Sequence, residues 1–145
     1  MGAIQFLKKV RAVKSQLPTL IDETLTEMNQ FFIDLNIDQL DNGLRSDGSG
    51  LGFYTNATIE IAKENGRPKS QMEINLHDTG EFWNRFQTMV FENMLVIDSL
   101  DKKTNMLINI YGKDIFGIPE ENKAEVSKRF TDILLAKIKN VLENA

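Results

Sequence analysis

Apolar and polar residues alternate with a helical period over the first forty residues. Four aliphatic side chains recur about one turn apart, at Ile4, Leu7, Val10 and Val13. Leu17-Pro18 predicts an interruption, because proline disfavours helical geometry in the residue before it. A second helix is predicted from about Thr19 to near Asp38. Its apolar stripe is formed by Ile21, Leu25, Met28, Phe32 and Leu35.

A glycine-rich stretch, residues 41–54, follows these helices. Glycine supplies positions that adopt positive φ, and the neighbouring Asp, Asn and Ser residues are typical of turns. The stretch lacks the glutamate that closes an EF-hand loop and the Gly-Lys-Ser/Thr ending of a phosphate-binding loop. We therefore expect an exposed loop.

Residues 55–112 predict a small α/β core. Thr55 begins a short helix that Asn65-Gly66 stops. Residues 72–76 alternate between apolar and polar, which is the period of a half-buried strand. Two further strands, 86–91 and 94–98, are predicted to join at Glu92-Asn93. Together these segments predict a mainly antiparallel sheet within about residues 70–99.

The C-terminal segment, 118–144, carries the clearest helical pattern. Pro119 fits the first position of a helix, and Glu120 and Glu121 complement its positive end. Its apolar face is formed by Val126, Phe130, Ile133, Leu134, Ile138, Val141 and Leu142. The pattern predicts a single α+β domain over 1–145, in which long terminal helices on a small sheet leave apolar surface for a partner.

Composition then removes several classes of chemistry. The 145 residues include no cysteine and a single histidine, His77, so disulfide frameworks, cysteine nucleophiles and thiolate metal sites are excluded. We expect no metal and no cofactor. No apolar run approaches the ~20 residues that span a bilayer, and the N-terminus lacks the pattern of a secretory signal. These features predict a cytoplasmic product without a membrane partner.

The net charge of −4 is unevenly distributed. Residues 22–41 carry six acids and no base, whereas residues 1–17 carry four bases and no acid, at Lys8, Lys9, Arg11 and Lys14. Such a basic arm can bind nucleic acid. The alternative is that the two segments are solvated helix faces, or that they pair with each other or with a neighbouring subunit.

Asp78-Thr79-Gly80 is the one motif that suggests catalysis. Aspartic-protease chemistry needs two carboxylates that share a proton, and a homodimer can supply one from each chain. However, His77 is polar where an apolar strand residue is wanted, and Glu81 stands where a small residue is usual. A capped turn is the favoured interpretation, and no catalytic residue is expected.

Two other groups of residues near this motif are candidates for a functional role. His77 beside Asp78 resembles a base with its orienting carboxylate, but the chain lacks a nucleophile motif to complete it. Trp83, with Phe82 and Phe86, is predicted to be core or interface rather than a base-stacking platform.

The middle of the chain carries a series of spaced motifs: residues 43–59 (GLRSDGSGLGFYTNATI), Lys63, Gly66-Arg67-Pro68 and 76–82 (LHDTGEF). These motifs resemble those of the virion-morphogenesis, or tail-completion, family of tailed bacteriophages. Family members have a glycine and an aromatic residue before Ser/Thr-x-x-Thr, then a short basic helix, then Leu-x-x-Thr-Gly-x-Leu/Phe. Ile110-Tyr111-Gly112 is similar to the closing motif, although the usual histidine is absent. The resemblance covers roughly residues 43–112 and is closest to versions from phages and prophages of the Bacteroides group.

This resemblance implies a structural role in the virion. Family members are non-enzymatic neck or tail-terminator proteins that form rings between head and tail, so the implied partners are further copies and other portal, neck or tail proteins. The implied location is the virion, after assembly in the host cytoplasm. The 41–54 loop would then reach a neighbour and order on assembly, and an acidic lumen would let phage DNA pass without specific binding.

Two alternatives from other classes remain. One is a small homodimeric hydrolase that uses Asp78. The other is a regulator that binds nucleic acid through Lys8, Lys9, Arg11 and Lys14.

Overall fold

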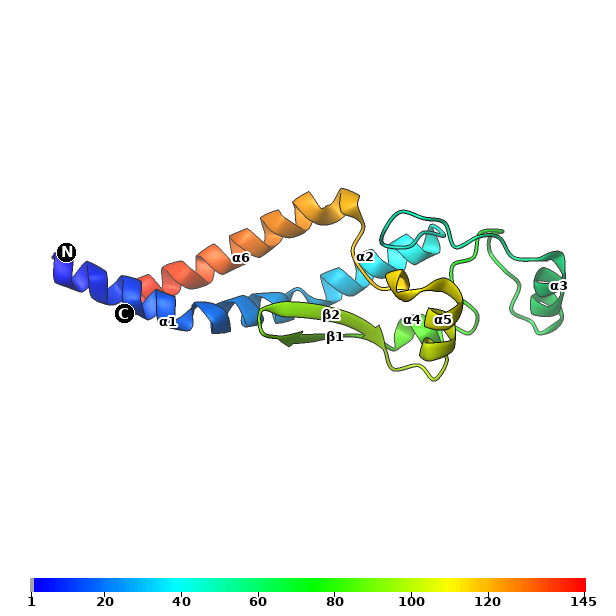
Figure 1. Ribbon diagram of the computed structural model, residues 1–145, viewed down its shortest axis with the longest axis horizontal. Helices are drawn as coiled ribbons and strands as arrows, with labels where there is room; N and C mark the ends of the chain where they lie inside the picture. The colour runs from blue at the N-terminus through cyan, green and yellow to red at the C-terminus, as the bar shows by residue number, and fades with distance from the viewer. Residues whose placement is uncertain (1) are drawn as a thin grey trace. The chain divides into compact units, whose positions relative to one another are not determined.

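Helices dominate the architecture, as the apolar spacing at both ends of the chain predicts. The computed structural model describes residues 2–145 (Figure 1). Its α-helices are α1 (Ala3–Glu27), α2 (Asn29–Asp41), α3 (Asn56–Glu64), α4 (Glu81–Asn84), α5 (Thr104–Tyr111) and α6 (Lys123–Asn144). Short 3-10 turns are η1 (Lys113–Ile115) and η2 (Glu120–Asn122), and one antiparallel hairpin pairs β1 (Phe86–Phe91) with β2 (Met94–Ser99). The predicted α+β class, with long N- and C-terminal helices, is confirmed.

The chain divides into two compact units. The helical unit comprises the residues up to Asn29, the hairpin segment Thr88–Val96, and Ala124–Ala145. The loop unit comprises Gln30–Gln87 and Ile97–Lys123.

The predicted interruption at Leu17-Pro18 is wrong, because α1 continues through Pro18 as a single helix. A proline inside a helix removes one hydrogen bond and is sterically costly. Burial of Leu20 and Thr24 on the following turn favours continuation. The helix ends instead at Met28, whose N–H bonds the carbonyls of Thr24 and Leu25. The stripe assigned to one helix over 19–38 is therefore divided between α1 and α2.

Polar contacts tie three segments together in the helical unit. The ammonium of Lys137 on α6 lies against the carboxylates of Glu27 and Glu23 on α1. These partners raise the pKa of Lys137, chiefly through its hydrogen bond with Glu27. At the hairpin tip, Asn93 donates from its backbone N–H to Asp22 Oδ1 (3.0 Å) and from its side chain to the Pro18 carbonyl (2.9 Å). Both α6 and the hairpin tip are thus held on the second half of α1.

The strand predicted over residues 72–76 is wrong. Only an isolated bridge joins Glu73 to Phe53, and Leu76 has a left-handed φ of 60°. The segment lies beside 52–54 for two backbone hydrogen bonds, from Tyr54 to Met72 and from Ile74 to Gly52. The Asn75 side chain then accepts the His77 N–H, so this N–H is not available to pair with a neighbouring strand. The sheet predicted within 70–99 is therefore reduced to the hairpin.

Several local predictions hold. Thr55 accepts the Thr58 N–H (3.1 Å) as the N-cap of α3, and Gly66 follows that helix with φ of 73°. The hairpin turns at Glu92-Asn93 as predicted. The C-terminal helix is confirmed, but its predicted start at Pro119 is wrong, because Glu120–Asn122 form the η2 turn and α6 begins at Lys123. The apolar segment 106–111, for which the sequence predicts no particular element, lies within helix α5.

The loop unit is organised by one fully buried amide, Asn36 on α2. Its Nδ2 donates to the Ile115 carbonyl (2.8 Å), and its Oδ1 accepts the Gly117 N–H (2.9 Å). Gly117 has φ of 145°, and an added Cβ would lie 2.6 Å from Ser46 Cβ, so only glycine fits there. Beside this segment Phe82, Phe86 and Phe116 form an aromatic cluster with ring centroids 5.1–5.9 Å apart.

A second buried amide on α2 contrasts with the first. Gln39 is buried, yet neither Nε2 nor Oε1 has a hydrogen-bond partner within residues 2–145. A buried polar group without a partner costs about 1–3 kcal/mol. Two amides of one helix therefore have opposite consequences for stability.

We expect Asn36→Ala to lower the free energy of unfolding by about 2–4 kcal/mol, because it leaves the half-buried Gly117 N–H and the buried Ile115 carbonyl unpaired. Gln39→Met, of similar length and without polar atoms, is expected to be neutral or to stabilise by about 1 kcal/mol. Urea denaturation of both variants measures the difference. Equal destabilisation by the two variants would contradict this assignment.

Candidate functional site

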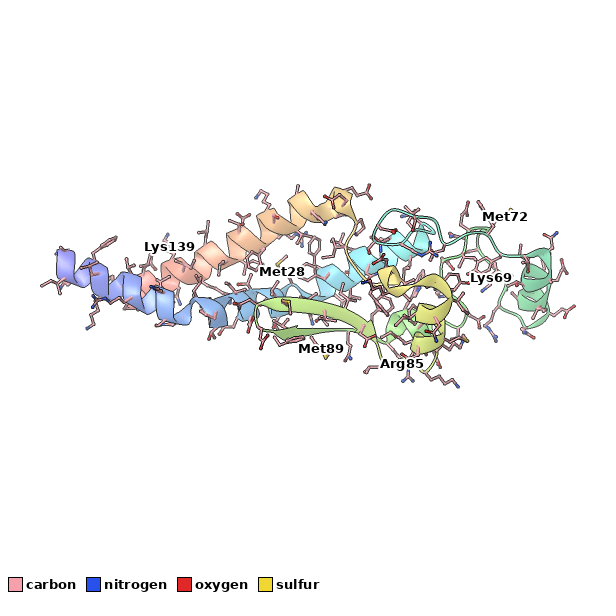
Figure 2. The ribbon with its side chains drawn as sticks, in the orientation of Figure 1. Met28, Lys69, Met72, Arg85, Met89 and Lys139 are labelled. Atoms are coloured by element: carbon pink, nitrogen blue, oxygen red, sulfur yellow. The ribbon has the colours of Figure 1, made fainter. Side chains whose placement is uncertain are left out.

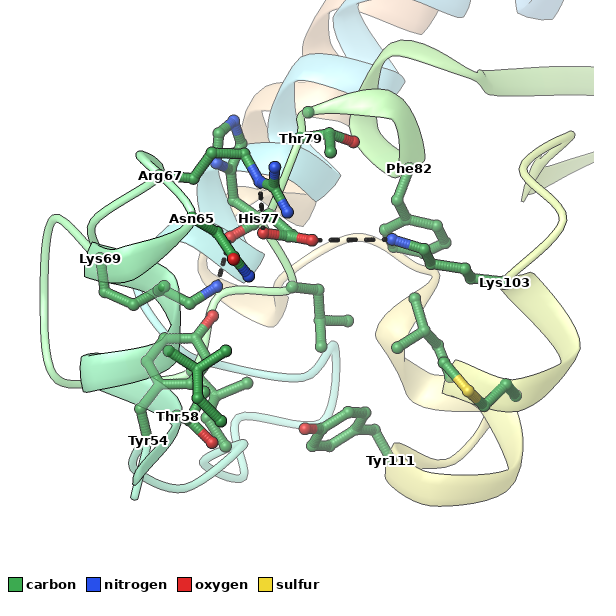
Figure 3. Close-up of a pocket in the computed structure, with 18 residues that line it drawn as sticks. Tyr54, Thr58, Asn65, Arg67, Lys69, His77, Thr79, Phe82, Lys103 and Tyr111 are labelled. Atoms are coloured by element: carbon green, nitrogen blue, oxygen red, sulfur yellow. Dashed lines mark hydrogen bonds and ion pairs between the residues drawn. The ribbon is translucent and has the colours of Figure 1, made fainter. Parts of the chain in front are cut away.

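A pocket of about 440 Å³ lies in the loop unit (Figure 3). Its apolar wall is lined by Ile61, Ala62, Ile74, Leu76, Phe82, Met106 and Leu107. Its polar rim carries Arg67, Lys69, Asp78 and Lys103. The volume falls in the range of small-molecule and side-chain sites, which are mostly apolar with a few placed polar groups.

Local chain geometry brings the rim residues together. Gly66 turns the chain after α3, and the Arg67 N–H bonds back to the Ala62 carbonyl (2.9 Å). Arg67 and Lys69 thereby return over α3, with Pro68 between them. Lys103 immediately precedes α5, whose first turn is fixed by the Thr104 hydroxyl bonding the carbonyls of Ser99 and Asp101. The position of the polar rim therefore depends on the turn that follows α3 and on the first turn of α5.

The rim holds three cations around one carboxylate. Arg67 Nε donates to Asp78 Oδ1 (3.1 Å), and Lys103 Nζ lies 3.8 Å from Asp78 Oδ2. Lys69 donates to the His77 carbonyl (3.0 Å) and lies 4.5 Å from the centre of the Tyr54 ring (Figure 3). A single negative charge does not balance these cations, so the rim is electropositive and can hold an anionic group attached to an apolar body.

These neighbours set the protonation of Asp78. The hydrogen bond from Arg67 lowers the pKa of Asp78 most, and the charges of Arg67, Lys69 and Lys103 lower it further against a smaller opposing effect of burial. Burial raises the pKa of Tyr54 on the same wall. Asp78 is therefore ionised at neutral pH, whereas an aspartic-type mechanism needs one carboxyl to keep its proton.

His77 and its aromatic neighbours have structural contacts. The His77 ring meets the edge of Trp83 at 4.7 Å between centroids. Trp83 Nε1 donates to the Asn75 carbonyl (3.2 Å), and Phe82 and Phe86 are buried. The Thr79 hydroxyl accepts the Glu81 N–H (3.3 Å), which is the capped turn predicted for this motif. The expectation that Phe82 and Phe86 belong to the core is confirmed.

The glycine-rich loop is tied to its own chain. Arg45 Nε donates to the Tyr111 carbonyl (2.6 Å) and its Nη1 to the Gly50 carbonyl, while the Ser46 N–H bonds the Asp114 carbonyl (2.8 Å). Most of the loop is exposed, but Gly43 and Leu51 are buried. The expectation that this loop orders only on assembly is therefore wrong, since these bonds form within one chain.

The basic arm lies on the first turns of α1. Lys8, Arg11 and Lys14 are exposed and Lys9 is half-buried, and none of the four has an ion-pair partner within the described chain. Exposed apolar side chains lie among them: Ile4, Phe6, Leu7 and Val10. The structure thus combines the basic arm with an uncovered apolar surface.

Sequence reasoning missed the cation cluster of Arg67, Lys69 and Lys103. Arg67 and Lys69 are close in sequence, but Lys103 is more than thirty residues away and only the fold brings it to Asp78. The available signal was the pair of basic residues around Pro68 after a helix stop, since such a turn presents both on one side.

Over residues 2–145 no three His, Asp or Glu side chains gather as metal ligands. The helices described there also include none with the length and apolarity needed to cross a bilayer. No family model, curated protein or solved structure matches the sequence.

The pairing of Asp78 predicts a measurable titration. A carboxyl with a depressed folded-state pKa stabilises the fold above its unfolded pKa, and this contribution disappears as pH falls through the folded value. Because Asp78 is 43% exposed, we expect Asp78→Asn to cost no more than about 1 kcal/mol at pH 7. Urea denaturation across pH 3–7 should show a shallower loss of stability in acid for this variant.

Arg67→Gln tests directly whether Arg67 causes the lowered pKa of Asp78. The pKa of Asp78, followed by NMR titration of its carboxyl carbon, should rise towards the ordinary value when Arg67 is removed. Lys128→Gln, which breaks a surface pair on α6, is the matched control and should leave Asp78 unchanged. An unaltered titration of Asp78 in Arg67→Gln would contradict the assigned pairing.

Proposed function

We propose that this chain is a structural virion protein of a tailed phage. In this role it self-associates as a ring at the neck or upper tail, where it joins the head connector to the tail. Its partners are further copies of the chain and the neighbouring portal, neck or tail proteins. It has no catalytic role in this proposal.

The observation that carries the proposal is the uncovered apolar surface at the start of α1. Ile4 is 83% exposed, and Phe6, Leu7 and Val10 are each more than 40% exposed. Single exposed apolar residues are common, but contiguous apolar surface on one helix end marks an interaction site. A role in assembly, in which another molecule covers these residues, explains why this surface is apolar.

The sequence resemblance over residues 43–112 supplies the particular assembly. Its motifs build most of the loop unit: the glycine-rich loop, the capped helix α3, the Arg67-Pro68 turn and the Thr79-Gly80 turn. Because Arg45 and Ser46 fix the loop to its own chain, the loop would offer a neighbour a preformed surface.

Charge supports a non-enzymatic role. Asp78, the residue required by the hydrolase alternative, is paired with Arg67 and Lys103 and favours the charged form. A ring whose lumen is lined by acidic side chains would let DNA pass, since phosphate contacts require bases. A lumen lined by Lys8, Lys9, Arg11 and Lys14 would overturn that part of the proposal.

The mass of the purified chain in solution, with negative-stain images, tests the proposal. We expect closed rings of one copy number, because a heterologous contact whose rotation closes gives a defined ring. Proteolytic activity that Asp78→Asn abolishes, without loss of the fold, would favour the hydrolase instead. Nucleic-acid binding lost on deletion of residues 1–17 would favour the regulator.

A further inference from the structure

The hairpin of the helical unit has an uncovered apolar face. In a two-residue hairpin, Phe91 lies opposite Met94 and Met89 lies opposite Val96, so all four project from the same face. Their exposed fractions are between 38% and 52%. Figure 2 shows Met89 on the side of the hairpin away from α1. The opposite face carries Val90 and Leu95, which are half-buried. A two-stranded ribbon with apolar residues on both faces needs a partner for the outer one.

The hairpin turn carries a second anomaly. Glu92 and Asn93 both have positive φ, 50° and 61°, as a type I′ turn requires. Asparagine tolerates this conformation, but glutamate is disfavoured there, and strained positions are concentrated at functional sites. The Asn93 side chain donates hydrogen bonds to Pro18 and Asp22 on α1, whereas the Glu92 carboxylate has no partner within residues 2–145. The turn therefore presents a free carboxylate at the end of the apolar face.

The start of α1 has the complementary character. Leu7 lies one turn from Ile4 and from Val10, and Phe6 lies one turn from Val10, so the four exposed residues form one surface. In the helical unit these turns extend past the end of α6 (Figure 1). The bases around them have no acidic partner within the described chain.

One chain cannot bring these two surfaces together. The hairpin tip is bonded to Pro18 and Asp22, and α1 is continuous from Ala3 to Glu27. Its first turns would have to fold back over the hairpin, which a continuous helix does not allow. Any contact between the two surfaces must therefore join different molecules.

We propose that the first turns of α1 in one copy bind the outer face of the β1–β2 hairpin in a second copy. The contact buries Leu7 and its apolar neighbours against Met89 and Phe91, as a helix covers one face of a sheet. Charge favours this pairing: residues 3–14 carry four bases and no acid, and residues 86–99 carry Glu92 and Asp98 and no base. This inference rests on the proposed self-association and names its interface.

The proposed contact uses two different surfaces of the same chain. Repeated from copy to copy it is heterologous and gives a closed ring if the rotation closes, whereas reciprocal exchange within one pair gives an isologous dimer with two equivalent contacts. The basic and acidic groups at its edge should make association faster at low salt, while the apolar contact maintains binding at high salt.

Phe91→Lys tests the hairpin side of the interface. The substitution places a cation opposite the basic helix, and we expect the self-association constant measured by sedimentation velocity to fall at least tenfold. Leu135→Lys is the matched control, since Leu135 is a similarly exposed apolar residue of the helical unit outside both surfaces, and it should change the constant less than twofold.

Glu92→Gly tests the contribution of charge. The substitution keeps the turn and removes the carboxylate, and it should weaken association severalfold at low salt and little at high salt.

Mixing two defective variants tests the pairing itself. Phe91→Lys retains an intact α1 surface, and Leu7→Glu retains an intact hairpin. Each should be monomeric alone, and an equal mixture should form one-to-one pairs by native mass spectrometry, because one intact contact is restored. Pair formation also shows that both variants are folded.

The outcomes separate this inference from the proposed function. If both variants still form the rings of the wild-type chain, or if their mixture remains monomeric, the proposed interface is wrong. The proposal that the chain is a ring-forming virion protein would be unaffected by either result. If the wild-type chain stays monomeric at high micromolar concentration, a second copy does not bind the outer face of the hairpin and this inference is wrong. Assembly on other virion proteins would then be tested separately.

Discussion

The loop unit depends on the two hydrogen bonds of the buried Asn36 side chain. They fix the Ile115 carbonyl and the Gly117 N–H against α2. Once this segment is placed, the carbonyls of Tyr111 and Asp114 are available to Arg45 and Ser46, which orders the glycine-rich loop. The close approach of Gly117 to Ser46 leaves no room for a Cβ. The glycine-rich loop, which has few apolar residues, is thus held by polar contacts to the segment 111–114 rather than by a core of its own.

The helical unit follows a different principle, in which a long helix holds its neighbours along only part of its length. Lys137 and Asn93 both bind α1 in its second half. The apolar side chains of its first turns, in contrast, are 41–83% exposed. The hairpin is bonded through its tip and leaves its outer face uncovered. Surfaces of this kind are costly for an isolated chain and are explained if another molecule covers them.

The chemistry of the pocket follows from the charges around Asp78. Carboxylates that act as acids are found where burial or a second carboxylate raises the pKa. Asp78 has the opposite environment, because Arg67 and Lys103 approach it on both oxygens. The remaining positive charge and the apolar wall favour binding an anion over proton transfer. Arg67 and Lys103 thus keep Asp78 ionised and, with Lys69, leave an electropositive rim on the pocket.

The sequence alone determined the elements whose signals are local. The period of the apolar residues predicted the terminal helices, the Thr55 cap and Asn65-Gly66 bounded α3, and Glu92-Asn93 located the hairpin turn. It failed where distant contacts outweighed local preference. Packing carries α1 through Pro18, and the Asn75 side chain takes the place of a strand partner near Leu76. Only the tertiary structure brought Lys103 to Asp78 and left one face of the hairpin exposed, because both depend on segments distant in sequence whose spacing carries no local signal.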